Sequence, residues 1–181
     1  DPYDLTKISL TDSILPPAWS AEGKSEYLLG TDQQGRDILS TIMYGGRISL
    51  VVAMSAVAMS IVMGVGLGLI AGYVGGRVES LIMRIADIQL TFPAILVALL
   101  ISGIGRQFVP KDMQDALAVY VIIFSIGLTE WPKYARTVRG ATLVEKSKEY
   151  VQAARVIGVS SFKIMVSHVL PNVLGPVLVI A

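Results

Sequence analysis

Long apolar stretches separated by short polar segments dominate this chain. No charged residue occurs between Arg47 and Arg77, a run of 29 positions. Roughly 20 apolar residues are enough for a helix to cross the hydrocarbon layer of a bilayer. The pattern therefore predicts a membrane-spanning helix over about 48–73.

Three further apolar stretches predict spans over about 80–104, 113–131 and 162–181. Phe92-Pro93 lies in the second stretch and is expected to kink it, because proline removes a backbone donor. The third has only 14 consecutive residues without charge, so its charged ends must reach the membrane surface. The fourth stops without a polar flank, so we expect it to be an incomplete span.

Composition supports a membrane protein. Of 181 residues, 53% are hydrophobic and 16% charged, and the mean hydropathy is +0.63. Because backbone polar groups in lipid must be paired within the protein, long apolar stretches predict an all-α, polytopic transmembrane helical bundle. A net charge of +1 gives no reason to expect nucleic acid as a partner. A sequence without cysteine and with one histidine offers no disulfide and no thiolate or histidine-rich metal site.

Small residues recur every four positions within the first predicted span. They are Ser60, Gly64, Gly68 and Gly72. Such a stripe lets the backbone of a neighbouring helix come close, so we expect a helix-packing face.

Residues 1–47 precede this span and are predominantly polar. Asp37 can cap a short helix that lies flat on the membrane, and Gly45-Gly46 is expected to be the corner into the bilayer. We interpret 1–47 as one domain that ends in an interfacial elbow. Residues 48–181 then form the transmembrane domain.

Two short helices are predicted between the third and fourth apolar stretches. Ser147 can cap the first, and Gly158 can end it in a left-handed turn. Ser160 or Ser161 can cap the second, which Pro171 should interrupt after one or two turns.

On the first of these helices Tyr150, Ala154 and Ile157 follow an i, i+4, i+7 path. Ala153 and Ala154 are small enough for another surface to approach closely. The pattern favours a docking element, although an amphipathic linker without a partner fits the same periodicity.

This segment resembles the cytoplasmic "EAA" motif of ATP-binding cassette (ABC) importer permeases. The match consists of Gln152-Ala153-Ala154, three residues, Gly158, and nine residues before His168-Val169-Leu170-Pro171. It departs from the family pattern at Gln152, where Glu is usual, and at His168, where a branched apolar residue is usual. Neither change breaks the helix-turn-helix geometry.

A second resemblance lies more than a hundred residues upstream. The sequences LGTD-x-x-GRD-x-L-S and YGGRISL, within 29–50, are similar to the segment before a core spanning helix in the C-type permease of dipeptide and oligopeptide importers. Members of that family also serve nickel and glutathione. The resemblance covers 29–181 and implies a type I importer permease fold.

The resemblance also implies a transport subunit that is not itself an enzyme. The sequence has no G-x-x-x-x-G-K-[ST] loop, so two separate ABC ATPase subunits would bind ATP and magnesium, and the chain itself would need no cofactor. Other expected partners are a second, B-type permease, an extracytoplasmic peptide-binding protein and the lipid bilayer. No substrate-binding residue is assigned. The residues expected to couple the chain to the ATPases are Tyr150, Gln152, Ala153, Ala154, Ile157, Gly158, Leu170 and Pro171.

Basic residues predict the orientation in a prokaryotic cell (inner) membrane. Seven of them fall in or beside the loop 132–161, whereas 105–112 holds two. The coupling loop 132–161 is therefore expected in the cytoplasm and 1–47 outside, with a further spanning helix upstream. We accordingly expect the sequence to be truncated at both ends. The seven residues are Lys133, Arg136, Arg139, Lys146, Lys148, Arg155 and Lys163.

Two other classes of protein fit part of the pattern. Arg84, Asp87 and His168 could form the intramembrane site of an ion-coupled secondary transporter. Arg84 and Asp87 are three residues apart, however, and are better interpreted as a structural pair. A membrane scaffold without transport activity would contain the same helices.

Overall fold

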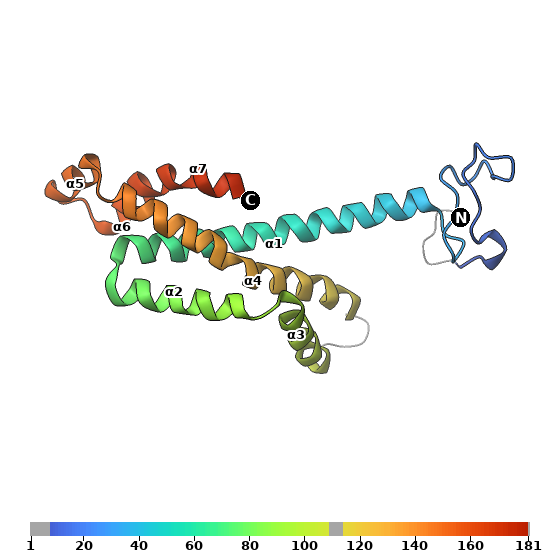
Figure 1. Ribbon diagram of the computed structural model, residues 1–181, viewed down its shortest axis with the longest axis horizontal. Helices are drawn as coiled ribbons and strands as arrows, with labels where there is room; N and C mark the ends of the chain where they lie inside the picture. Colours follow the sequence, from blue (N-terminus) through green and yellow to red (C-terminus); the bar gives the residue numbers. More distant parts are fainter. Residues whose placement is uncertain (1–7, 109–113, 181) are drawn as a thin grey trace. The chain divides into compact units, whose positions relative to one another are not determined.

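The computed structural model describes residues 8–108 and 114–180, and its regular structure within these ranges is helical, with no strand (Figure 1). The prediction of an all-α chain is confirmed. The chain divides into two compact units, Asp1–Val51 and Val52–Ala181, where the sequence pattern suggested a boundary after residue 47. The elements are η1 (Leu10–Asp12), α1 (Ile38–Val74), α2 (Gly76–Thr91), α3 (Ala94–Phe108), α4 (Gln114–Glu145), α5 (Glu149–Val156), α6 (Ser161–Ile164), η3 (Met165–Val169) and α7 (Leu170–Ile180).

A tight turn precedes α1 in the first unit. Asp32 Oδ1 accepts hydrogen bonds from the backbone N–H groups of Gln34 (2.8 Å) and Arg36 (3.0 Å). Its Oδ2 accepts a third from the Arg36 side chain at 2.9 Å. Gly35 lies inside the turn with φ +75°, in the left-handed region that glycine adopts without strain. The carboxylate therefore holds the turn closed.

Asp37 caps α1 as predicted. Its carboxylate accepts hydrogen bonds from the backbone N–H (2.8 Å) and hydroxyl (2.6 Å) of Ser40. The helix then continues through Gly45-Gly46 to Val74, so the corner expected at the two glycines is not formed. Glycine permits a turn but does not impose one, because its backbone groups can continue the helical hydrogen bonds.

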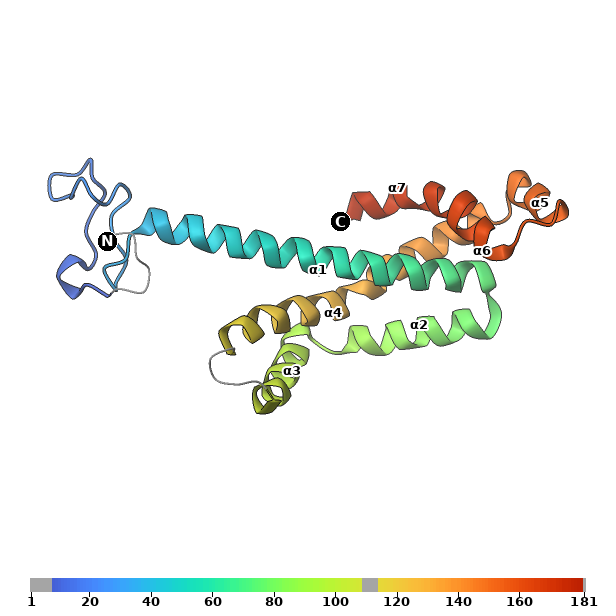
Figure 2. The ribbon, with the colours of Figure 1, turned by 180° about the vertical axis from the view of Figure 1, so that it is seen from behind.

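The second unit is a helical bundle in which α4 packs against α2, α3 and α7 (Figures 1 and 2). Its main core joins α1, α4 and α7 to the short helices α5 and α6. The short helices therefore share a core with the long ones. The buried residues of this core are Val65, Leu69, Tyr134, Val138, Val151, Ala154, Ile164, Val169, Val173 and Val177.

The second predicted span is divided into two helices. α2 ends at Thr91, α3 begins at Ala94, and the two are bent by 87°. Phe92 between them has φ −91° and ψ 120°, the extended conformation favoured before a proline. The bend lies at the predicted Phe92-Pro93, but it is a complete break, so 80–104 is not one kinked helix.

α4 is longer than the predicted third span, 113–131, of which Met113 lies outside the described residues. Pro132 lies buried inside the helix, which continues to Glu145. Residues 132–145, assigned to a loop from the sequence, are therefore helical. Proline costs a helix one hydrogen bond, but the turns that follow it bury residues against α1, which outweighs that loss.

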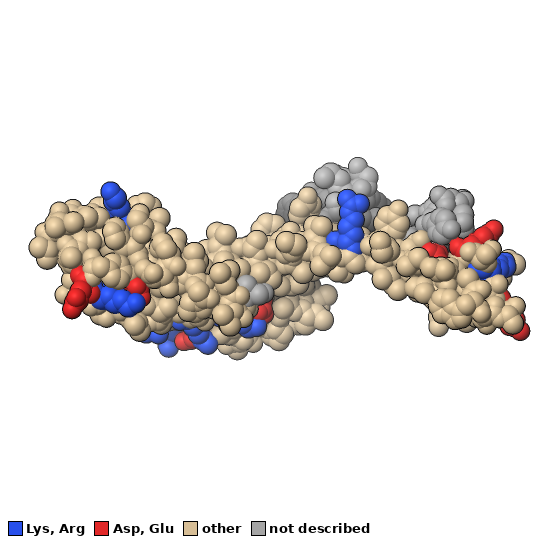
Figure 3. Space-filling model, turned by 90° about the horizontal axis from the view of Figure 1, so that it is seen from above, with Lys and Arg blue, Asp and Glu red and all other residues tan. Residues whose placement is uncertain are grey.

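Within the described ranges, two helices are long and apolar enough to cross a membrane. They are Ile38–Val74 and Ser161–Ile180, which joins α6, η3 and α7, and the bent α2–α3 pair could provide a third. The span over 113–131 stays a prediction. In the space-filling view most of the visible surface is uncharged, and the charged side chains gather in a few places (Figure 3).

Candidate functional site

α5 and α6 form a helical hairpin between α4 and α7 (Figures 1 and 2). Lys148 is the N-cap residue of α5, whereas Ser147, which was predicted to cap it, donates its hydroxyl to a carbonyl of α4 at 2.7 Å. Gly158 follows α5 with φ +82°, the left-handed turn that was predicted. Ser160 caps α6 by accepting a hydrogen bond from a backbone N–H at 3.4 Å, also as predicted.

The inner face of α5 is buried. Val151 and Ala154 lie in the core beside Ile164 of α6. Ala154 was predicted on a docking face with Tyr150 and Ile157, but it is 5% exposed and faces inwards. Ile157 is the C-cap residue of α5, and its backbone N–H still donates to the Ala153 carbonyl at 3.1 Å.

The outer face of the hairpin is exposed and largely apolar. It consists of Gln152, Ala153, Val156 and Ile157. Val156 is 87% exposed and Ile157 77%, whereas Phe162 of α6 borders a hollow beside α1. Exposed apolar side chains that cluster at the end of a structure are suited to contact with a partner.

The Tyr150 hydroxyl connects α5 to two other helices. It donates a hydrogen bond to the carboxylate of Glu145 at the end of α4. It accepts one from the side-chain amide of Asn172 in α7 at 3.0 Å. The same amide donates to the His168 carbonyl at 2.8 Å, and that carbonyl lies 3.2 Å from the hydroxyl. These four residues form what we name the Tyr150 network.

Charge strengthens this network. The Glu145 side chain is 9% exposed and also pairs with Lys148 at 2.8 Å. The hydrogen bonds from Lys148 and Tyr150 hold the pKa of Glu145 below its ordinary value. Burial, and the hydrogen bond to Glu145, raise the pKa of Tyr150. At neutral pH the carboxylate is therefore ionised and the protonated hydroxyl donates to it.

A separate contact joins α5 to α1. The guanidinium of Arg155 lies over the ring of Tyr73, with its central carbon 5.1 Å from the ring centroid. An arginine at this distance is attracted to the negative face of the ring. The hairpin therefore contacts α1, α4 and α7.

The helix after the hairpin continues past Pro171, contrary to the prediction of an interruption there. Met165–Val169 forms one wide π-helical turn directly before α7, and the run Ser161–Ile180 is continuous. A wide turn relieves the clash between a proline ring and the preceding carbonyls. Pro171 is exposed and Leu170 is half-buried.

The stripe of small residues on α1 lies against α4. A Cβ atom on Gly64 would lie 2.4 Å from Cβ of Tyr134, and one on Gly68 would lie 2.5 Å from the Ala135 carbonyl oxygen. Real Cβ atoms do not approach other atoms so closely. The backbones of α1 and α4 can therefore pack this tightly only because these positions of α1 are glycines. The stripe residues in contact with α4 are Ser60, Gly64, Gly68 and Gly72.

Two ion pairs join α2 to α4. Asp87 pairs with Arg136, and Glu79 pairs with Arg139, whose Nε lies 2.6 Å from Glu79 Oε1. The sequence indicated neither pair, because 49 and 60 positions separate the partners.

The predicted pair of Arg84 with Asp87 is therefore wrong. Arg84 is exposed, and α4 supplies a different partner for Asp87. Among the residues that the structure describes, no hydrogen bond or ion pair connects Arg84, Asp87 and His168 with one another. They do not form a joint intramembrane site.

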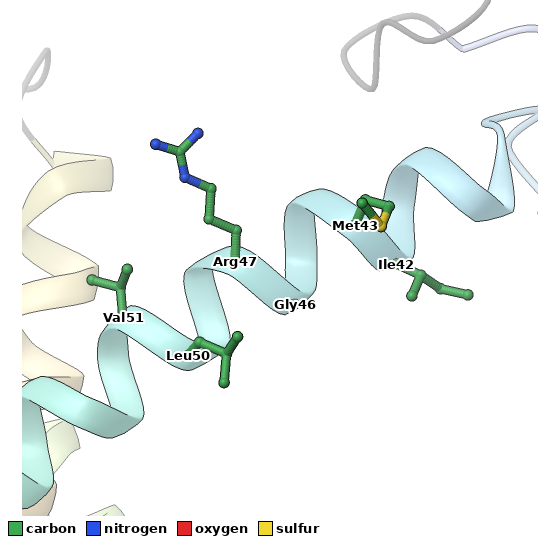
Figure 4. Close-up of a pocket in the computed structure, with 6 residues that line it drawn as sticks. All are labelled: Ile42, Met43, Gly46, Arg47, Leu50 and Val51. Carbon is green, nitrogen blue, oxygen red and sulfur yellow. The ribbon is translucent and has the colours of Figure 1, made fainter.

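A hollow on the surface of α1 does not add a site. All of its lining residues belong to α1, and the hollow lies at Gly46, which has no side chain to fill it. Figure 4 shows the Arg47 side chain extending away from Leu50 and Ile42. No cluster of metal-binding side chains occurs within 8–108 and 114–180. The lining residues are Ile42, Met43, Gly46, Arg47, Leu50 and Val51.

Sequence reasoning missed Glu145, Asn172 and Tyr73. The i, i+3 spacing of Glu145 and Lys148 was one available signal. Asn172 was another, because a polar side chain in an apolar stretch usually finds a partner. No local pattern indicated the contact of Arg155 with Tyr73.

A bundle of apolar helices with a short amphipathic hairpin before its last long helix defines an α-helical, multi-pass membrane protein. Residues 64–181 match the family model described as "Binding-protein-dependent transport system inner membrane component", and the chain belongs to this family. The resemblance to importer permeases is confirmed at this level.

Similar proteins include permeases of peptide transport systems. The "Dipeptide transport system permease protein DppC" of Haemophilus influenzae is 39% identical over 98% of this chain and 57% of its own length. The "Di/tripeptide transport system permease protein DppC" of Pseudomonas aeruginosa is 37% identical, over 98% and 55%. The "Glutathione transport system permease protein GsiD" of Pectobacterium atrosepticum is 39% identical, over 86% and 48%. The chain thus spans about half the length of these curated relatives.

Proposed function

We propose that this chain is a permease subunit of an ATP-driven importer of dipeptides or oligopeptides. It would contribute to the translocation path and couple to separate ATPase subunits through the α5–α6 hairpin. The family supports transport, and the printed names of the relatives support peptides as cargo. The observation that carries the coupling role is the hairpin, which has an exposed apolar outer face and an inner face inside the bundle core.

This geometry suits the transmission of motion. A soluble motor can displace spanning helices only through an element that it grips and that is firmly joined to those helices. The outer face would provide the grip, and the buried Val151 and Ala154 provide part of the joint. ATP and magnesium would bind to the two ATPase subunits. A B-type permease and an extracytoplasmic binding protein would complete the complex.

Reconstitution tests the proposal. The full-length protein, its permease partner, the ATPases and the binding protein are placed in liposomes, and uptake of a labelled dipeptide is measured. Uptake should require ATP and continue when a proton uncoupler is added. Uptake that collapses with the uncoupler while ATP is maintained would instead support the ion-coupled transporter. Unchanged uptake after deletion of 150–158 would support the scaffold.

Competition measures the cargo. Unlabelled oligopeptides should reduce dipeptide uptake more strongly than glutathione or nickel does. Stronger competition by glutathione would move the assignment towards the relative that carries that name. Stronger competition by nickel would favour nickel as the cargo, which some members of the resembled family import.

A substitution on the outer face tests the proposed contact between the hairpin and an ATPase subunit. Ile157→Asp places a charge on the exposed apolar surface and should reduce the amount of ATPase that co-purifies with the permease. Val144→Asp is the matched control, because Val144 is 64% exposed on α4 and lies outside the outer face. Equal losses from both variants would contradict a specific contact at Ile157.

A further inference from the structure

The Tyr150 network lies where α5 meets α4 and α7, apart from the outer face that the proposed function uses, and the Tyr150 side chain is 38% exposed. Its acceptor, Glu145, is the buried last residue of α4. Its other members, His168 and Asn172, belong to η3 and α7. One hydroxyl therefore joins the hairpin to the helix before it and to the helix after it.

We propose that Tyr150 is a positioning residue whose hydroxyl locks α5 to the end of α4 and the start of α7. When the hairpin is displaced, α4 and α7 then move together with it. This inference rests on the proposed function and adds to it the residue that makes the hairpin a rigid joint.

The kind of contact supports a lock. The apolar contacts of Val151 and Ala154 are not directional, so they allow small rotations of α5. Hydrogen bonds fix direction as well as distance, and those to an ionised carboxylate are stronger than neutral ones. The Tyr150 hydroxyl combines such a bond to α4 with a bond to α7.

The hairpin has a second attachment that does not depend on this hydroxyl. Arg155 contacts Tyr73 of α1, and Val151 and Ala154 are buried in a core to which the Tyr150 hydroxyl does not belong. Tyr150→Phe keeps the aromatic ring and removes only the oxygen. We therefore expect the variant hairpin to stay folded and its outer face to stay available, while the link to α4 and α7 is loosened.

The experiment uses the complete importer in liposomes and measures dipeptide imported per ATP hydrolysed. Tyr150→Phe should lower this ratio about tenfold, the scale of one hydrogen bond to a charged group. ATPase co-purification should stay unchanged, and the thermal unfolding midpoint should fall by no more than a few degrees, because Lys148 still pairs with Glu145. Asn172→Leu removes the α7 side of the same link and should also lower the ratio. Tyr44→Phe, which removes a hydroxyl from an exposed residue of α1, is the control and should leave it unchanged.

The outcomes separate the two proposals. If the wild-type complex shows no ATP-driven import, the proposed function fails. If it imports but Tyr150→Phe keeps the wild-type ratio, the positioning role is overturned and the function stands. If Tyr150→Phe instead releases the ATPases, Tyr150 belongs to the docking contact and the positioning role is again overturned. Should that variant not be recovered folded, a wild-type ratio for Asn172→Leu overturns the role.

Discussion

At the scale of single residues, two acids in the stretch 29–50 show how a motif can act on its own backbone. Asp32 closes a turn through two backbone N–H groups, and Asp37 caps α1. Both positions need a short side chain that accepts hydrogen bonds, which accounts for aspartate at each. The structural role of these acids is therefore sufficient to explain them.

Asp32 should make this turn sensitive to acid. Hydrogen bonds from Arg36 and Gln34 hold its pKa below the ordinary value. A carboxyl with a lowered pKa stabilises the folded state above its unfolded pKa of about 3.9, and this contribution is lost as pH falls through the folded pKa. Hydrogen exchange at the Gln34 and Arg36 amides, corrected for intrinsic rates, should therefore accelerate below about pH 4. Asp32→Asn should remove the dependence, and wild-type protection that persists to about pH 2 would contradict it.

Two glycines of α1 should respond oppositely to the same change. Gly68→Ala places a Cβ 2.5 Å from the Ala135 carbonyl and should destabilise the protein by about 1–3 kcal/mol. A Cβ on Gly66 meets nothing within 4 Å, so Gly66→Ala should stabilise the helix by up to about 1 kcal/mol. Unfolding midpoints of the purified protein in detergent measure both, and equal midpoints would argue against the α1–α4 contact.

At the scale of elements, local signals located turns and caps better than helix lengths. Gly158 and Ser160 delimit the hairpin because a left-handed turn and a cap depend on a few adjacent residues. Pro132 did not end α4, and Pro171 did not break the following helix. Packing of the following turns compensates for Pro132, and the wide turn at Met165–Val169 accommodates Pro171. The local sequence reveals neither.

The ion pair between Glu79 and Arg139 should contribute to the docking of α2 on α4. Glu79→Arg and Arg139→Glu should each destabilise the protein, and the double variant should recover part of the loss. Both side chains are partly exposed, so the coupling energy should be about 1 kcal/mol or less. A double-mutant cycle on thermal unfolding measures it, with Arg77→Glu on the exposed side of α2 as the control. Strictly additive losses would mean that the pair contributes nothing.

At the scale of the whole molecule, the distribution of charge predicts which side of the membrane each segment faces. The basic residues near 132–161 predict that the hairpin faces the cytoplasm. Docking on an ATPase requires the same side. A hairpin on the outside of the cell would therefore contradict both the predicted orientation and the proposed coupling role.

Labelling measures the orientation directly, because these 181 residues contain no cysteine. In the full-length protein, freed of cysteine elsewhere and expressed without its ATPase subunits, Ile157→Cys should react with an impermeant maleimide only after the membrane is opened. Trp19→Cys should react in intact cells or spheroplasts. Both positions are highly exposed, at 77% and 72%, so access within the protein does not limit either reaction. Labelling of position 157 in intact cells would exclude the coupling role.

The order of residues was enough to identify a helical membrane protein, the turn at Gly158, and the stripe from Ser60 to Gly72. These features depend on composition or on neighbours a few positions away, so the chain alone carries them. The partner of Asp87, the inward face of Ala154 and the Tyr150 network depended on which helices become neighbours in space. Contacts between segments tens of residues apart leave no periodic trace in a single sequence, so only the folded bundle revealed them.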